Sequence, residues 1–313
     1  MRKKLFALFA FVVSAALFAL FTFVVSAALF AVGASAAPAA KDKDELDLYA
    51  YTVADLNVVN PETGRTLRGR LYRPVTAGRT PLAICAHELG SNYARRWPQY
   101  GKSLASHGAA VYTFDFAGGG PKERADGTPG SHSDGETTEM SVMTDVNDLE
   151  AVLAAAKTWD FVDSGRIALI GGSQGGAVSV VAAARHAGDF KTLVLLYPAL
   201  LIRDDLHKKF ASADACPPVY KYNGWLDVSP VYVKDMWDYD LYVDMPKYDG
   251  PVLILHGDRD EIVPMSYSER AAAARKNTKS GGRRRFPCGK RRGGFRFSFA
   301  VNPLPARAAA KFA

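Results

Sequence analysis

Cysteine is scarce in this 313-residue chain, which contains only Cys85, Cys216 and Cys288. Three widely separated cysteines cannot form a closed disulfide framework, and none belongs to a C-x-x-C pair of the kind that holds a metal or works in redox chemistry. Apolar residues, by contrast, make up 48% of the chain and charged residues 23%. These values are typical of a globular protein, so the composition excludes a mostly disordered, collagen-like or disulfide-stapled chain.

Acidic residues are absent after position 274, where twelve basic residues follow. Three more basic residues stand at 2–4, near the amino end. The stretch between these two ends has 24 basic and 32 acidic residues, a net charge of −8, although the whole chain carries +7. Because the ends supply all of the basic excess, the charge of the body gives no reason to expect a specific nucleic-acid partner.

The amino end has the three parts of a secretory signal. Basic residues precede an uncharged apolar run over 5–32, and Ala34-Ser35-Ala36 fits an A-x-A cleavage site. The run is 28 residues long because FVVSAALFA at 11–19 recurs letter for letter at 23–31. We predict a signal peptide over 1–36 and a secreted or cell-envelope protein. An uncleaved membrane anchor is the alternative, because about 20 apolar residues span a bilayer.

Between about 45 and 275 the chain alternates short apolar segments with segments of helical spacing, which predicts a single domain. Apolar strands separated by helices predict an α/β fold with a mostly parallel sheet that helices cover on both faces. The stretch 200–250 is too irregular for one crossover helix and is expected to be an inserted lid. The predicted strands are 48–59 and 66–73, as a hairpin, then 81–87, 109–116, 166–170, 191–197 and 251–255; the predicted helices are 94–106, 137–159 and a third that ends near 186.

The motif G-x-S-x-G at 171–175 carries the sharpest chemical signal. It directly follows the apolar segment 166–170 and precedes a helix of small residues, so Ser173 is expected on a tight strand-to-helix turn that lifts its hydroxyl above the sheet. A helix N-terminus favours negative charge, and the backbone N–H of Gln174 is placed to donate to an oxyanion. The motif predicts that Ser173 is a nucleophile; a glycine-rich turn without chemistry is the alternative.

The segment 256–264, HGDRDEIVP, follows the last apolar strand. An acid is expected there if the chain uses the order Ser, Asp, His. Asp260 is preferred to Asp258, which falls on the turn itself, and either aspartate would otherwise cap that turn. His256 is expected to be structural.

A second loop follows the strand predicted at 81–87. The backbone N–H of Leu89 is expected to supply the second oxyanion donor. His87 is expected to hold this loop and not to act as the base.

Five stretches resemble the serine esterases of the α/β-hydrolase fold, and within that fold the cinnamoyl and feruloyl esterases. They occur in the family's order: HELGSN at 87–92, FDF at 114–116, SDG at 133–135 before MSV at 140–142, SQGG at 173–176 and HGDRDEIVP at 256–264. The resemblance implies an α/β-hydrolase fold in which Ser173 is the nucleophile and Asp260 the triad acid. The N–H groups of Leu89 and Gln174 would form the oxyanion hole.

The same resemblance implies a small-molecule or polysaccharide-linked ester as substrate, with no metal and no organic cofactor. The lid would hold the acyl part of the ester. Its candidate contacts are aromatic, with buried lid-core side chains as the alternative: Tyr220, Tyr222, Trp225 and Trp237. The sequence departs from the family at Glu88, where glycine is usual, and in the longer loop 117–132.

A histidine is missing where the triad needs one. The base that takes the Ser173 proton should follow Asp260, but the six histidines stand at 87, 107, 132, 186, 207 and 256. The segment 280–294, SGGRRRFPCGKRRGG, has neither strand alternation nor helical spacing. We interpret the end of the chain as out of frame or replaced and predict a disordered basic tail over 276–313. A cationic tail for nucleic acid or anionic envelope polymers is the alternative.

The leading hypothesis is a secreted serine carboxylic-ester hydrolase that works through an acyl-enzyme, with hydroxycinnamoyl (feruloyl) esters as its specific case. Without a triad histidine, the chain as written is predicted to be inactive or nearly so. One alternative is a serine peptidase or thioesterase-like hydrolase on the same fold, because a fold does not determine a reaction. The other alternative is a non-catalytic binding protein.

Overall fold

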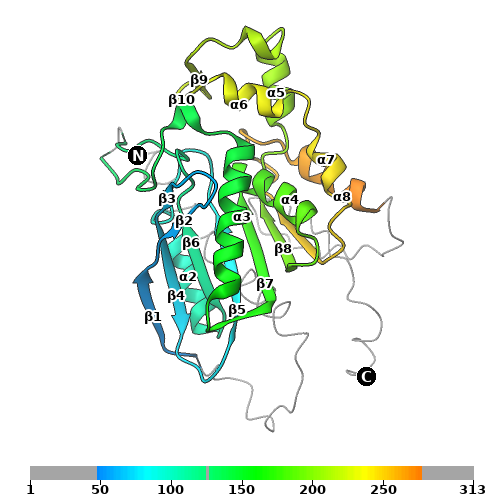
Figure 1. Ribbon diagram of the computed structural model, residues 1–313. Helices are drawn as coiled ribbons and strands as arrows, with labels where there is room; N and C mark the ends of the chain where they lie inside the picture. The colour runs from blue at the N-terminus through cyan, green and yellow to red at the C-terminus, as the bar shows by residue number, and fades with distance from the viewer. Residues whose placement is uncertain (1–47, 125–126, 277–313) are drawn as a thin grey trace, which may run out of the picture.

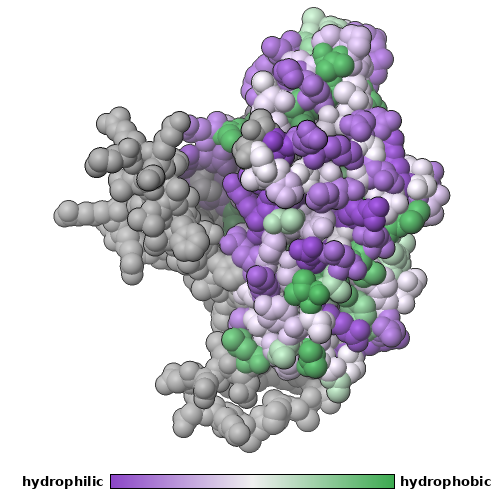
Figure 2. Space-filling model, turned by 90° about the vertical axis from the view of Figure 1, so that its left-hand side faces the viewer, coloured by the Kyte–Doolittle hydropathy of each residue, from purple (hydrophilic) through white to green (hydrophobic). Residues whose placement is uncertain are grey.

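The computed structural model describes residues 48–124 and 127–276 (Figure 1). The signal peptide predicted over 1–36 lies outside these residues, and so does the basic tail predicted over 276–313, apart from its first residue. The face shown in Figure 2 is largely hydrophilic, and its hydrophobic side chains are scattered, as is usual for the surface of a folded domain.

The central sheet has seven strands in the order β1-β4-β6-β5-β7-β8-β11 (Figure 1). The five strands from β6 to β11 run parallel, and β4 and β1 continue the sheet in antiparallel pairing. This arrangement confirms the predicted α/β class with a mostly parallel sheet. The strands are β1 (Tyr51–Asp55), β4 (Gly69–Pro74), β5 (Thr80–Ala86), β6 (Ala110–Phe114), β7 (Val162–Gly172), β8 (Phe190–Leu196) and β11 (Val252–Leu255).

The predicted amino-terminal hairpin is present and carries a second, smaller ladder. Tyr51 pairs with Pro74 at one end of the β1–β4 ladder. Nearer the turn, β2 (Val58–Val59) pairs with β3 (Thr66–Leu67) outside the central sheet. The hairpin therefore ends in a separate two-stranded piece.

Helices cover both faces of the sheet, as the continuous apolar strands predict. On one face lie α3 (Val142–Thr158) and α4 (Gln174–Arg185), whose apolar side chains join the larger core cluster. On the opposite face α2 (Trp97–Ser106) packs against β4 and β6, where Trp97 is fully buried. Successive residues of β5 point to opposite faces of the sheet. Ile84 belongs to the core cluster on the side of α3, and Cys85 belongs to a second, smaller cluster on the side of α2. This alternation places the core on both sides of one sheet.

The helix predicted over 137–159 is shorter than expected. A 3₁₀ turn, η1 (Thr137–Glu139), comes first, and α3 begins only after Ser141, which has extended backbone geometry. The Ser141 hydroxyl accepts hydrogen bonds from the N–H groups of Met143 and Thr144, so it caps the helix. The serine cap therefore decides where the helix begins, although Met140 continues the helical spacing of apolar residues on the other side of the cap.

The stretch 200–250, called the insertion below, first lies beyond the carboxyl ends of the parallel strands and then returns toward their amino ends (Figure 1). There the Tyr248 hydroxyl donates to the Phe190 carbonyl at 3.2 Å. The two strands of the insertion are joined by Asn223-Gly224-Trp225, and the first two of these residues have positive φ, 49° and 79°. Asn-Gly is the residue pair that a type I′ hairpin turn favours, so this hairpin follows from local sequence. The elements of the insertion are α5 (Ile202–Lys209), η2 (Ala213–Ala215), β9 (Tyr220–Tyr222), β10 (Leu226–Val228), α6 (Pro230–Trp237) and α7 (Leu241–Asp244).

The last described helix, α8 (Met265–Lys276), is held by a buried arginine. The Arg275 guanidinium donates to the carbonyl oxygens of Met245 and Tyr248 from Nη1, at 3.1 and 2.7 Å, and to that of Gly250 from Nη2, at 2.8 Å. These three carbonyls belong to the segment between α7 and β11. Arg275 therefore ties α8 to the segment that leads into the last described strand.

No helix within 48–124 or 127–276 combines the length and the apolar character needed to cross a membrane.

We expect Arg275→Met to lower the free energy of unfolding by about 3 kcal/mol, because methionine keeps the aliphatic stem but leaves three interior carbonyls without a donor. Urea denaturation measures the change. Lys221→Met is the control, since the Lys221 side chain is 62% exposed in a surface ion pair. Equal stabilities of the Arg275 variant and the control would contradict the role assigned to Arg275.

Candidate active site

Ser173 stands on a strained turn between β7 and α4. Its backbone has φ 51° and ψ −117°, a conformation that non-glycine residues rarely adopt. Glycines make the turn possible: a Cβ on Gly171 would lie 2.3 Å from the Gly175 carbonyl oxygen, and one on Gly175 would lie 2.2 Å from the Ala86 carbonyl oxygen. The turn therefore needs glycine at both positions of the motif. Such strain is typical of a nucleophile presented above a sheet.

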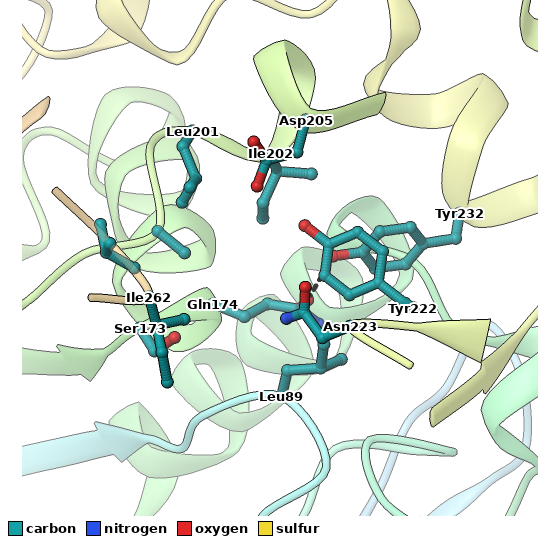
Figure 3. Close-up of a pocket in the computed structure, with 12 residues that line it drawn as sticks. Leu89, Ser173, Gln174, Leu201, Ile202, Asp205, Tyr222, Asn223, Tyr232 and Ile262 are labelled. Atoms are coloured by element: carbon teal, nitrogen blue, oxygen red, sulfur yellow. Dashed lines mark hydrogen bonds between the residues drawn. The ribbon is translucent and has the colours of Figure 1, made fainter. Parts of the chain in front are cut away.

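Ser173, Leu89 and Gln174 line one pocket (Figure 3). Leu89 comes from the loop after β5, and Gln174 is the first residue of α4. Within the described residues, neither the Leu89 N–H nor the Gln174 N–H donates a hydrogen bond. The sequence predicts that these three residues meet, because the carboxyl ends of adjacent parallel strands lie together. The hydroxyl can attack a carbonyl carbon, and the two unpaired N–H groups can donate hydrogen bonds to the oxyanion that results.

The rest of the pocket combines five apolar residues with four polar ones, and the sequence did not indicate three of the polar ones. Leu201 and Ile202 form one wall, and Ile262 stands beside Ser173 (Figure 3). The missed polar lining residues are Asp205, Asn223 and Tyr232. The Asn-Gly turn could have indicated Asn223, but Asp205 and Tyr232 lie on helices of the irregular insertion, where local pattern does not reveal which side chain points inward.

The four aromatic candidates have different environments. Tyr222 lines the pocket. Trp225 is 48% exposed, and its indole lies over Gly90 in the Leu89 loop, where a Cβ would come within 2.1 Å of the ring. Tyr220 packs edge-on against Phe210, and Trp237 packs on His207 with ring centroids 4.2 Å apart. The structure thus brings Tyr222, but not Tyr220 or Trp237, to the pocket.

Asp260 lies in the loop between β11 and α8. Its Oδ1 accepts hydrogen bonds from the N–H groups of Ile262 and Val263, both at 2.9 Å, and its Oδ2 lies 3.5 Å from His256 Nε2. Asp260 therefore organises the loop that carries two pocket residues. In the described part of the chain, no hydrogen bond connects Asp260 to Ser173. The alternative Asp258 has a buried Oδ1 without a partner among those residues.

Both histidines near the motifs are engaged in loop contacts. His87 Nε2 accepts from the Phe116 N–H at 3.2 Å, and its Nδ1–H donates to the Glu88 carbonyl at 2.7 Å. His256 is 1% exposed; its Nε2–H donates to the Val263 carbonyl at 2.8 Å, and its Nδ1 accepts from the Ser268 hydroxyl at 2.6 Å. All six histidines fall within the described residues, and none lines the pocket. The site therefore lacks a histidine base.

The motif FDF holds the loops around the pocket through its aspartate. The buried Asp115 carboxylate accepts hydrogen bonds from the N–H groups of Tyr93 and His132, at 2.6 and 2.8 Å. The backbone carbonyl of Asp115 accepts from the Ser133 hydroxyl at 2.6 Å. One residue thus links the loop after Leu89 to the segment that contains SDG.

Glu88, which stands where a glycine is usual, packs beside the nucleophile turn. A Cβ on Gly172 would lie 3.3 Å from Glu88 Oε1. That oxygen also accepts from the Tyr197 hydroxyl at 2.9 Å. The half-buried Glu88 side chain therefore joins the loop after β5 to the end of β8.

Gln174 lies at the centre of a buried polar cluster. Its Nε2 donates to Asp145 Oδ2 at 2.9 Å, and its Oε1 accepts from the Tyr232 hydroxyl at 2.8 Å (Figure 3). Asp145 is 1% exposed, and its Oδ1 has no hydrogen-bond partner among the described residues. Burial raises the pKa of the Asp145 carboxyl well above its usual value of 3.8, because the protein interior stabilises a negative charge less well than bulk water does. The folded protein therefore keeps Asp145 protonated at pH values where the unfolded chain loses that proton.

Because the folded state binds one proton more than the unfolded state above about pH 4, this linkage makes the protein less stable as the pH rises. The loss is about 1.4 kcal/mol per pH unit until the folded carboxyl ionises. Asparagine cannot ionise, so we expect the stability of Asp145→Asn relative to the unsubstituted protein to increase from pH 4 upward. Urea denaturation at several pH values measures the difference, with the exposed Asp160→Asn as control. A difference that stays constant with pH would show that Asp145 ionises freely in the folded state.

Within residues 48–124 and 127–276, no group of three or more histidine, cysteine, aspartate or glutamate side chains is arranged to hold a metal ion.

Two sequence comparisons relate the chain to known proteins. The profile of the prolyl oligopeptidase family (Peptidase_S9) matches residues 101–284. Quorum-quenching protein AidA of Acinetobacter baumannii (strain MDR-ZJ06) is 30% identical over 114 residues, 36% of this chain and 34% of that protein. The match thus spans about a third of the relative's length.

Among solved structures, Est1E from Butyrivibrio proteoclasticus with ferulic acid bound has a TM-score of 0.62 and 26% identity, covering 71% of this chain and 86% of that one. Acetyl xylan esterase 1 from Thermoanaerobacterium sp. JW/SL YS485 has a TM-score of 0.52 and 19% identity, covering 75% of this chain and 76% of that one. The second likeness supports the fold alone.

Proposed function

Because the chain belongs to the prolyl oligopeptidase family and has the α/β-hydrolase fold, we propose that it is a serine carboxylic-ester hydrolase that uses Ser173 as its nucleophile. One observation carries the proposal: the Ser173 hydroxyl and the unpaired N–H groups of Leu89 and Gln174 line the same pocket. The signal pattern at 1–36 supports an exported protein.

The proposed reaction proceeds through an acyl-enzyme. The Ser173 oxygen attacks the ester carbonyl carbon, and the carbonyl oxygen takes up negative charge facing the N–H groups of Leu89 and Gln174. Collapse of this tetrahedral intermediate breaks the bond to the alcohol and leaves the acyl group on Ser173. Water then attacks the acyl-enzyme and releases the acid.

The proposed reaction needs proton transfers for which the pocket has no histidine. Ser173 must lose its proton during attack, and the leaving alcohol must gain one, yet no histidine lies at the site. In serine hydrolases, loss of triad residues slows turnover by about 10⁴- to 10⁶-fold while the oxyanion hole continues to act. We therefore propose that Asp260 is the acid of an incomplete triad and that this chain turns over esters very slowly.

The pocket favours a phenolic acyl group. Half of its lining residues are apolar, and Asp205 and Tyr222 lie on the insertion side, away from Ser173 (Figure 3). The Asp205 Oδ1 accepts from Lys208 Nζ at 3.1 Å. A carboxylate in such a position can accept a hydrogen bond from a phenol hydroxyl. A hydroxycinnamoyl group combines a flat apolar body with that hydroxyl. The likeness to an esterase that binds ferulic acid supports the same substrate class.

A peptidase is the second candidate, since the matching family is named for its peptidases. The pocket lining favours the ester hydrolase: a cavity lined by apolar and aromatic side chains with one carboxylate suits a phenolic acid better than a peptide chain.

The first test supplies the missing base from solution. We expect a fluorophosphonate probe to label Ser173 slowly, and imidazole to accelerate labelling at least 10-fold, because a small base can enter the pocket and take the Ser173 proton. Mass spectrometry of the tryptic peptide measures the adduct. Ser173→Ala with the same imidazole concentration corrects for chemistry in solution. Labelling elsewhere in the chain, or none with imidazole, would contradict the proposed nucleophile.

The second test concerns the acyl group. We expect Asp205→Leu to weaken ferulate binding about 10-fold and to leave binding of 3,4-dimethoxycinnamate within about twofold, because only ferulate has the phenol hydroxyl that Asp205 would bind. Calorimetry measures both affinities. Asp227→Leu is the control, since Asp227 forms a surface ion pair with Lys221 in the same insertion. Equal losses for the two ligands would contradict the proposed contact.

A further inference from the structure

The two ends of the pocket differ in their exposure to solvent. At the end that the insertion covers, Tyr222 is 6% exposed, and Ile202 and Tyr232 are almost fully buried. Ile262 lines the same pocket but is 73% exposed. Figure 3 shows Ile262 beside Ser173, with Tyr222 at the far end. The pocket is therefore enclosed by the insertion and open to solvent next to the nucleophile.

The loop that carries Ile262 is held on both sides of this residue. Asp260 Oδ1 accepts from the N–H groups of Ile262 and Val263, both at 2.9 Å. The carbonyl of Val263 in turn accepts from His256 at 2.8 Å, and Val263 is buried. Ile262 itself adds little to the stability of the fold, because most of its apolar surface stays in water. An apolar side chain is thus held at the open end of the pocket, where a ligand can cover it.

The chemistry of ester cleavage gives each part of the ester its own direction. In the tetrahedral intermediate, the carbon bonds to the Ser173 oxygen, the oxyanion, the acyl group and the alcohol oxygen. The oxyanion faces the N–H groups of Leu89 and Gln174, and the proposed acyl group extends toward Asp205. The alcohol oxygen takes the direction that is left, toward the open end at Ile262.

We propose that Ile262 is the specificity residue for the alcohol part of the ester, and that the site takes esters of large alcohols. The side chain of Ile262 packs against the first carbons of the alcohol, since isoleucine offers only C–H surface and no hydrogen bond. Beyond Ile262 the alcohol enters solvent, so its further length meets no wall. The inference rests on the proposed function for the direction in which the ester lies.

Three substitutions separate this contact from general surface effects. Ile262→Ala removes the contact, and Ile262→Leu keeps an apolar side chain of the same size. Val243→Ala is the matched control, because Val243 on α7 is 58% exposed and does not line the pocket. Exposed positions tolerate such changes with little effect on folding. Each substitution is made together with Ser173→Ala, so that the esters used as ligands are not consumed.

The first measurement compares butyl ferulate with ferulate by calorimetry. We expect Ile262→Ala to weaken binding of butyl ferulate about fivefold and to leave ferulate within about twofold, because only the ester has an alcohol chain to contact Ile262. Ile262→Leu and Val243→Ala should keep both affinities within about twofold. Equal losses for the two ligands, or no loss for butyl ferulate, would overturn the assignment of Ile262.

The second measurement tests the open end with a large alcohol. A feruloylated arabinoxylan trisaccharide should bind within about tenfold of methyl ferulate, because the sugar units beyond the ester bond lie in solvent. Rejection of the trisaccharide ester by more than that would show that the alcohol end is closed.

The third measurement separates this inference from the proposed function. Isoleucine methyl groups are labelled with ¹³C, and their resonances are followed on addition of each ligand. Ferulate should shift Ile202 alone, and butyl ferulate should shift both Ile202 and Ile262. No shift of Ile202 with either ligand would reject the proposed substrate class. Shifts of Ile202 without any of Ile262, or a shift of Ile262 with ferulate, would overturn the inference and leave the nucleophile untouched.

Discussion

The strained turn at Ser173 is the constraint on which the rest of the site depends. A serine with positive φ is stable there only because Gly171 and Gly175 let three backbone segments approach within distances that a Cβ would prevent. The turn ends β7, starts α4 and brings the hydroxyl to the edge of the sheet where the loop after β5 also ends. Leu89 and Gln174 become neighbours of Ser173 through this geometry, although 84 positions separate Leu89 from Ser173.

The polar residues around the turn divide into two groups. Asp115, His87 and His256 have their hydrogen-bonding atoms engaged with loop backbone or nearby side chains, so they shape the pocket and have no free atom to exchange protons with a substrate. The N–H groups of Leu89 and Gln174 face the pocket without an acceptor among the described residues, and Asp205 lines the same pocket while its Oδ1 accepts from Lys208 Nζ at 3.1 Å. The site has the parts that bind an ester and its oxyanion, and it lacks the part that moves a proton. Under the proposed function, that division would let the fold and the pocket persist in a chain that turns over esters slowly.

Sequence alone predicts the features that local pattern or chain topology determines. The apolar strands predict the sheet, G-x-S-x-G predicts the turn at Ser173, and the meeting of Leu89 with Gln174 follows from parallel strand order. The start of α3 is mispredicted because the hydroxyl of Ser141 caps the helix within an otherwise helical spacing. Asp205 and Tyr232 are not predictable in this way, since their direction depends on how the irregular insertion packs onto the sheet.

The most direct test of the central claim is a crystal structure of the protein with an arylboronic acid. A boron atom that bonds covalently to the Ser173 oxygen imitates the tetrahedral intermediate and needs no histidine to reach equilibrium. The account predicts a tetrahedral adduct on Ser173, with one boronate oxygen within about 3 Å of both the Leu89 and Gln174 nitrogens. A boronate bound away from Ser173, or an adduct whose oxygens face neither N–H group, would contradict it.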